Sequence, residues 1–218
     1  DITCRDWSSD VCSSDLLQGR IVTEMSGQTR KEEKESMHEK SQELLNRAVA
    51  DELAAVHQYM YFHFHCDDQG YDLLATLFKQ TAIQEMRHIE QLSERILFLG
   101  GDVAMKVSHE VQQIRDVRKM LETARKMEED SAKDYNRAAI ECTNNADSAS
   151  RQIFEGLVSD EERHFDQFDN EITAMEKFGD NYLALQSIER SKNRAAGQER
   201  DSRRQADVRQ RGSPNAAA

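Results

Sequence analysis

The stretch QTAIQEMRHIEQL, residues 80–92, places Glu85 and His88 three positions apart in a segment with the apolar period of a helix. Residues three positions apart lie on the same face of a helix. Phe78 and Leu92 fall on this face too, so the helix directs a carboxylate and an imidazole toward its apolar side. Because an isolated buried carboxylate is costly or gives up its charge, this pair requires partners elsewhere in the chain.

Four segments share this helical period. They cover residues 37–67, 70–99, 115–144 and 147–177. The only proline is Pro214, near the end of the sequence, so no proline interrupts any of the four. Four helices of similar length are typical of a helical bundle.

The connections between these helices predict how they are arranged. DDQG at 67–70 and TNNAD at 143–147 are short turn signals, whereas residues 100–116 form a long connection. We therefore expect an all-α fold, an antiparallel four-helix bundle with a long crossover that leaves the second and third helices parallel. Beyond Gly179, Asp180 is a suitable N-cap for a short fifth helix.

One spacing rule relates six residues of the four predicted helices. Glu52 precedes Glu85 by the same number of residues as Glu128 precedes Glu161, and a histidine follows each second glutamate by three. These histidines are His88 and His164. Both glutamate pairs are centred on a short predicted turn. Residues equidistant from the turn of an antiparallel hairpin lie at one height, so we expect all four glutamates at one level of the bundle.

Four buried carboxylates at one level would repel one another strongly unless cations neutralise them. Carboxylate oxygens with one imidazole per ion suit iron or manganese. The pattern, one Glu from each of two helices and Glu-x-x-His from the other two, is that of di-iron carboxylate bundles. Tyr59, seven residues after Glu52 on the same face, is a further candidate, for hydrogen bonding to a ligand or for redox steps, with a packed core tyrosine as the alternative.

Composition restricts the function further. Lys and Arg number 29 against 41 Asp and Glu, a net charge of −12, which argues against nucleic acid as a partner and suits small cations. No apolar run is long enough to span a membrane, and the four cysteines form no CxxC pair, so we expect a cytoplasmic protein. We expect one helical-bundle domain over 36–192. Residues 1–35, which contain the adapter-like RDWSSDVCSSDL, and the Arg-rich 193–218 are predicted to be disordered tails.

The chain resembles the bacterioferritins over roughly residues 40–192. The resemblance is carried by ADELAAVHQY, QEMRHIEQLSERILFLGG, SDEERHFDQF and FGDNYLALQSI. It implies a ferritin-like fold in which the six residues are ferroxidase di-iron ligands, with Glu85 and Glu161 bridging the metals. It also implies that Met86 is the axial ligand of a haem b on a subunit dyad. Gln80 and Gln84 stand where some members carry an inner-surface His and acid.

The resemblance further implies a homo-24-mer built from dimers that oxidises Fe(II) with O2 or H2O2 and stores ferric mineral, with a ferredoxin-type reductant as a possible partner. Two alternatives stay open from the residues alone. One is a non-storage di-metal peroxidase or oxidase of the same bundle, although the Cys-rich module of a rubrerythrin-like protein is missing. The other is a metal-free helical scaffold whose acidic residues align by chance.

Overall fold

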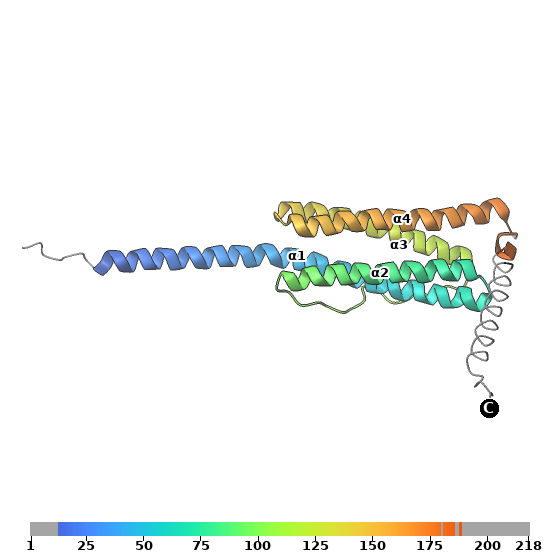
Figure 1. Cartoon of the computed structure of the whole chain (residues 1–218), viewed down its shortest axis with the longest axis horizontal. Coiled ribbons are helices and arrows are strands. Elements are labelled where there is room, and N and C mark those ends of the chain that lie inside the picture. The colour runs from blue at the N-terminus through green and yellow to red at the C-terminus, as the bar shows by residue number, and fades with distance from the viewer. Residues whose placement is uncertain (1–12, 180, 186–187, 189–218) are drawn as a thin grey trace, which may run out of the picture.

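A computed structural model describes the backbone of residues 13–179, 181–185 and 188, and their side chains from residue 39 onward. Its four long helices are α1 (Ser13–Gln69), α2 (Asp72–Phe98), α3 (Val117–Asn144) and α4 (Ser148–Phe178). α1 pairs with α2 and α3 with α4, and the two hairpins pack through α1 against α3 and α2 against α4 (Figure 1). The predicted four-helix bundle is confirmed.

None of the described helices combines the length and apolar character that crossing a membrane requires.

The first helix differs from the prediction. α1 begins at Ser13 and projects beyond the bundle (Figure 1), so residues 13–35 are helical where we expected a disordered tail. We predicted helices from an apolar period, which residues 13–35 lack. A helix that has already formed gains one backbone hydrogen bond for each residue that it adds, and no proline interrupts it here. Residues 1–12 and 193–218 lie outside the described residues, and the domain limits at 36 and 192 stay predictions.

A long crossover, residues 99–116, joins α2 to α3 and runs along α1. Asn46 and Gln58 on α1 hold it by hydrogen bonds to its backbone: Asn46 contacts Asp102 and Ala104, and the buried Gln58 both donates to and accepts from Gln112. Because the crossover returns along the length of the bundle, α2 and α3 are parallel, as predicted.

A short helical stretch follows Gly179, where we expected a fifth helix. Residues 181–185 are helical, and the Tyr182 amide donates to the Gly179 carbonyl at 3.0 Å. The Tyr182 hydroxyl donates to Glu171 Oε2 at 2.5 Å, which fixes this stretch against α4. Asp180, the expected N-cap, lies outside the described residues.

The apolar core is divided into two clusters at opposite ends of the bundle. One contains Tyr59, Phe78 and Phe168, and the other contains Leu92 and Phe154. On each helix, the residues of one cluster and those of the other lie on either side of a predicted ligand. The polar groups therefore lie at one level between two apolar layers, where access of water is restricted.

An ion-pair network fixes the α3–α4 turn to α2. Asp147, the N-cap of α4 and 7% exposed, accepts hydrogen bonds from the Ser150 amide at 3.1 Å and from Arg95 Nη2 at 2.6 Å. Burial would raise the pKa of Asp147, but hydrogen bonds from Ser150 and Arg95 hold it at about 2. The ionised carboxylate of Asp147 therefore stabilises the folded state at every pH at which it has lost its proton.

We expect Asp147→Asn to lower the free energy of unfolding by about 1–3 kcal/mol at neutral pH, because it leaves the mostly buried Arg95 without its anion. The folded-state pKa is depressed, so this stabilisation is present above the usual pKa of 3.8 and is lost as pH falls toward 2. Urea unfolding at pH 7 and pH 3 measures it. Asp130→Asn, which removes an exposed pair with Lys126, should change little. Equal losses for the two variants would contradict the assignment.

Candidate metal centre

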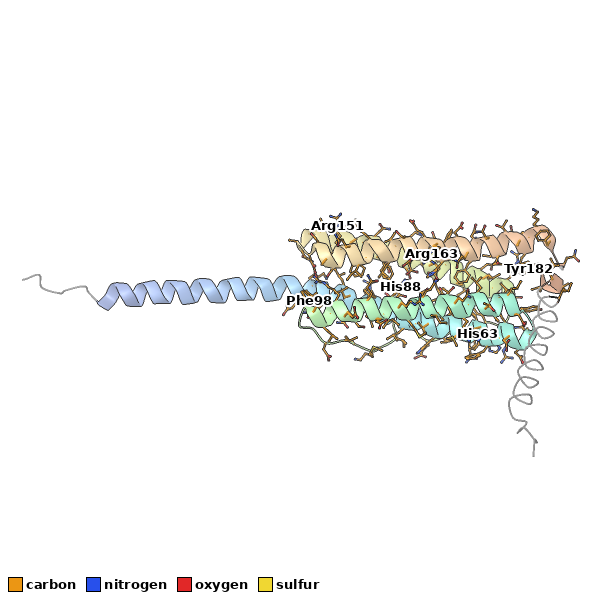
Figure 2. All side chains as sticks on the ribbon, in the orientation of Figure 1. His63, His88, Phe98, Arg151, Arg163 and Tyr182 are labelled. Atoms are coloured by element: carbon orange, nitrogen blue, oxygen red, sulfur yellow. The ribbon has the colours of Figure 1, made fainter. Side chains whose placement is uncertain are left out.

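The structure brings all six predicted ligand residues together at one level. Each helix contributes one glutamate, and α2 and α4 each add a histidine one turn further on. They are Glu52, Glu85, His88, Glu128, Glu161 and His164. Each is at most 5% exposed, and His88 lies midway along the four-helix part (Figure 2).

These residues form two overlapping clusters of possible metal ligands. Glu52 and His88 belong to one cluster, Glu128 and His164 to the other, and Glu85 and Glu161 to both. Within each cluster, one ligand atom from every residue lies within 4.8 Å of the others. The geometry thus provides two adjacent subsites with two shared carboxylates.

The contacts of the shared carboxylates show how they join the subsites. Glu85 Oε2 lies 2.8 Å from His88 Nδ1, while its Oε1 lies 3.0 Å from His164 Nδ1. The two oxygens of Glu161 also face different histidines: Oε1 lies 3.3 Å from His88 Nδ1, and Oε2 lies 3.6 Å from His164 Nδ1. The imidazole ring centroids are 6.0 Å apart. One oxygen of each shared carboxylate therefore faces each subsite, which is the arrangement that a bridging ligand needs.

The outer glutamates each face one histidine. Glu52 Oε1 lies 3.3 Å from His88 Nδ1, and Glu128 Oε2 lies 3.6 Å from His164 Nδ1. Each subsite therefore has one imidazole nitrogen, one outer carboxylate and a share of two bridging carboxylates. This donor set is rich in oxygen, with one nitrogen per ion, and it fits iron or manganese.

The electrostatics of the cluster reflect the burial of its negative charge. Burial raises the pKa of Glu52 well above its usual range, and the charges of Glu161 and Glu85 add to the rise. The pKa of Glu128 is also raised, with burial as the first cause. Burial would lower the pKa of His164, but the surrounding carboxylates raise it to about 12. Without metal, protons thus supply the positive charge that the carboxylates require.

Several atoms of the cluster make no well-aligned hydrogen bond, although the imidazole nitrogens and carboxylate oxygens face one another at 2.8–3.6 Å. Among residues with described side chains, seven buried polar atoms are unpaired, and five of them belong to this centre. They are both carboxylate oxygens of Glu85, Oε1 of Glu161, and Nδ1 of His88 and of His164. Buried polar atoms in proteins are nearly always paired. Five such atoms converge on one volume between carboxylates and imidazoles, so the residues present fit a pair of metal ions.

Comparisons with known proteins give the family. Residues 42–178 match the ferritin-like domain. Bacterioferritin of Desulfovibrio desulfuricans is 34% identical over 142 residues, covering 65% of this chain and 79% of the relative. Bacterioferritin of Rhodobacter capsulatus is 33% identical over 144 residues, covering 66% of this chain and 89% of the relative. The chain belongs to the bacterioferritin family.

A solved bacterioferritin shares the fold. The crystal structure of the D. desulfuricans bacterioferritin, which describes its diiron site in different catalytic states, superposes with a TM-score of 0.69 at 33% identity. The match covers 71% of this chain and 90% of that chain.

Two tyrosines hold the outer glutamates of this bacterioferritin family member. Tyr59, a predicted site residue, donates its hydroxyl to Glu128 Oε1. Tyr135 donates to Glu52 Oε1 at 2.7 Å, and we did not predict it as a site residue. Tyr135 follows Tyr59 by 76 residues, the same spacing by which Glu128 follows Glu52 and Glu161 follows Glu85, so the ligand pattern is a sequence repeat. Extending that repeat to tyrosines would have found it.

The predicted haem ligand lies outside the cluster. Met86 follows Glu85 on α2, and its side chain is directed away from the paired subsites because one residue turns a helix by about 100°. It is 48% exposed, which leaves its thioether available to a ligand or to a second subunit of a bacterioferritin.

Proposed function

We infer that this chain is a ferroxidase that stores iron. The observation that carries the inference is the pair of overlapping ligand clusters that share Glu85 and Glu161, in a chain of the bacterioferritin family. Fe(II) is the substrate and ferric mineral the stored product. We propose the six clustered residues as the ligands of two iron ions.

The role of the protein follows from its geometry. Bound iron supplies the electrons that pass to the oxidant. Glu85 and Glu161 would hold two ions side by side, and each histidine directs Nδ1 toward one of the two subsites. Tyr59 and Tyr135 orient the outer carboxylates by hydrogen bonds, and the apolar layers on either side restrict water.

Stopped-flow oxidation tests the function. Anaerobic protein loaded with two Fe(II) per chain should oxidise them rapidly when O2 or H2O2 is added, and electron microscopy after repeated loading should show filled hollow particles. Rapid oxidation without mineral would favour the non-storage di-metal enzyme. Failure to bind iron inside the bundle would favour the metal-free scaffold.

Self-association is part of the proposal. Large apolar side chains are exposed at separate places on the single chain, among them Phe98 (79%), Phe64 (61%) and Ile140 (61%). They form no single patch that would by itself indicate a subunit contact, so the proposal is based on the bacterioferritin relatives. We propose a homo-24-mer built from dimers. The preferred oxidant, a ferredoxin-type reductant and a cytoplasmic location stay predictions from the family resemblance and the composition.

Haem binding by Met86 is a separate proposal. A haem b between two copies of Met86 requires a dimer, and the exposed thioether supports that placement. We expect Met86→Leu to remove the haem absorption band while Fe(II) oxidation at the paired site continues at the parental rate, because Met86 is not one of the clustered ligands. A visible spectrum of each purified protein measures this. Haem bound equally by parent and variant, or no haem in the parent, would contradict the proposal.

A further inference from the structure

The residue before each shared glutamate contacts a histidine of the centre from outside. Gln84 precedes Glu85, and Asp160 precedes Glu161. His164 Nε2 lies 2.5 Å from Gln84 Oε1, and His88 Nε2 lies 3.3 Å from Asp160 Oδ2. Each histidine thus directs Nδ1 toward the carboxylates and Nε2 toward a group on the opposite helix.

This arrangement is symmetric in position but not in charge. The two motifs read QEMRH at 84–88 and DEERH at 160–164. When Nδ1 faces a metal ion, Nε2 carries the remaining proton and donates it outward. His164 then donates to a neutral amide, whereas His88 donates to a carboxylate.

A carboxylate partner strengthens a histidine ligand. A hydrogen bond to an ionised acceptor is roughly twice as strong as one between neutral groups, and a carboxylate acceptor raises the basicity of the metal-binding nitrogen. The shorter contact with Gln84 lacks this charge. Arg163 offsets part of the charge of Asp160, but it contacts Oδ1 at 2.5 Å and leaves Oδ2 to His88. The side chains of Arg163 and Asp160 are both more than 40% exposed, so solvent weakens their ion pair. Figure 2 shows Arg163 near the level of His88.

The ligand distances differ in the same direction. The three carboxylates around His88 Nδ1 lie at 2.8, 3.3 and 3.3 Å. Those around His164 Nδ1 lie at 3.0, 3.6 and 3.6 Å. The carboxylate oxygens of the His88 subsite therefore lie closer to their histidine than those of the His164 subsite do to theirs.

We propose that Asp160 is a positioning residue that makes the two subsites unequal, so that the subsite of His88 binds its metal ion first and more tightly. The proposal rests on the two-metal site of the proposed function and adds an order of filling to it. Asp160 acts through His88 and contacts neither metal position itself.

Substoichiometric cobalt loading tests the order. Crystals of the full-length protein with one Co(II) per chain should give a cobalt anomalous peak that is stronger beside His88 than beside His164. We expect Asp160→Asn, which keeps the shape of the side chain, to weaken the first Co(II) binding step about 10–100-fold and to reduce this preference. Isothermal titration measures the binding step without any oxidation reaction.

The repeat provides a matched exchange. Gln84→Glu combined with Asp160→Asn moves the carboxylate from one histidine to the other without changing side-chain length, and the stronger cobalt peak should move to His164. A purely structural role of Asp160 would not reverse the order. Equal peaks in the parent, or an unchanged first step in Asp160→Asn, would overturn the proposal while two Co(II) per chain still support the two-metal site. Binding of no Co(II) inside the bundle would overturn both.

Discussion

Glu161→Ala should abolish rapid Fe(II) oxidation while the chain still folds and assembles. Glu161 belongs to both ligand clusters, so its removal takes a ligand from each proposed iron position. Loss of an outer hydrogen-bond partner of a metal ligand typically costs 10–100-fold, so loss of a shared ligand should reduce the oxidation rate by more than about 100-fold. Stopped-flow absorbance after Fe(II) is mixed with the oxidant measures this rate.

Glu162→Ala is the matched control, because Glu162 is the next residue on α4 and is exposed. This substitution also removes a glutamate carboxylate, but one that lies outside the cluster, so the oxidation rate should stay close to the parental value. Particle size by light scattering shows whether each variant assembles. Parental rates in Glu161→Ala would contradict the ligand assignment, whatever the state of assembly.

Metal ions should stabilise the folded protein strongly. Carboxylates that are buried together repel one another, and a bound cation removes that repulsion only in the folded state. At a free Co(II) concentration of about 100 times the dissociation constant, each subsite adds about 2.7 kcal/mol. Two subsites together add about 5 kcal/mol, which raises the midpoint of thermal unfolding by about 10–20 °C in a chain of this size. Circular dichroism with and without Co(II) measures this shift.

The control for this experiment is the same titration of Glu161→Ala, which should lose most of the stabilisation because neither subsite is complete. Co(II) avoids the oxidation that would accompany Fe(II). An equal rise of the midpoint in parent and variant would show that the metal acts elsewhere on this acidic chain, and would contradict the account.

The sequence predicted the bundle and the position of the buried acids well, because both depend on periodic patterns. The apolar period gave α2, α3 and α4 to within about two residues, as is usual for helix ends. Equal spacing about two turns placed four glutamates at one level, and the structure has them there. The role of these residues as iron ligands stays a proposal.

Features that depend on contacts without a sequence period could not be predicted from the sequence. The N-terminal part of α1 has no apolar stripe, so the signal that we used does not report a helix there. The course of the crossover depends on amide hydrogen bonds from Asn46 and Gln58, whose partners lie more than 50 residues away. Tyr135 and Asp160 contact the cluster from other helices, and only the repeat relates them to Tyr59 and Gln84.

Anomalous diffraction from crystals loaded anaerobically with Fe(II) tests the central claim most directly. The account predicts two iron peaks per chain inside the bundle, one beside His88 Nδ1 and one beside His164 Nδ1, about 3.5–4 Å apart as in other two-metal sites. Glu85 and Glu161 should lie between the peaks and contact both. Iron found only on the surface, or the six side chains arranged around water alone, would contradict it.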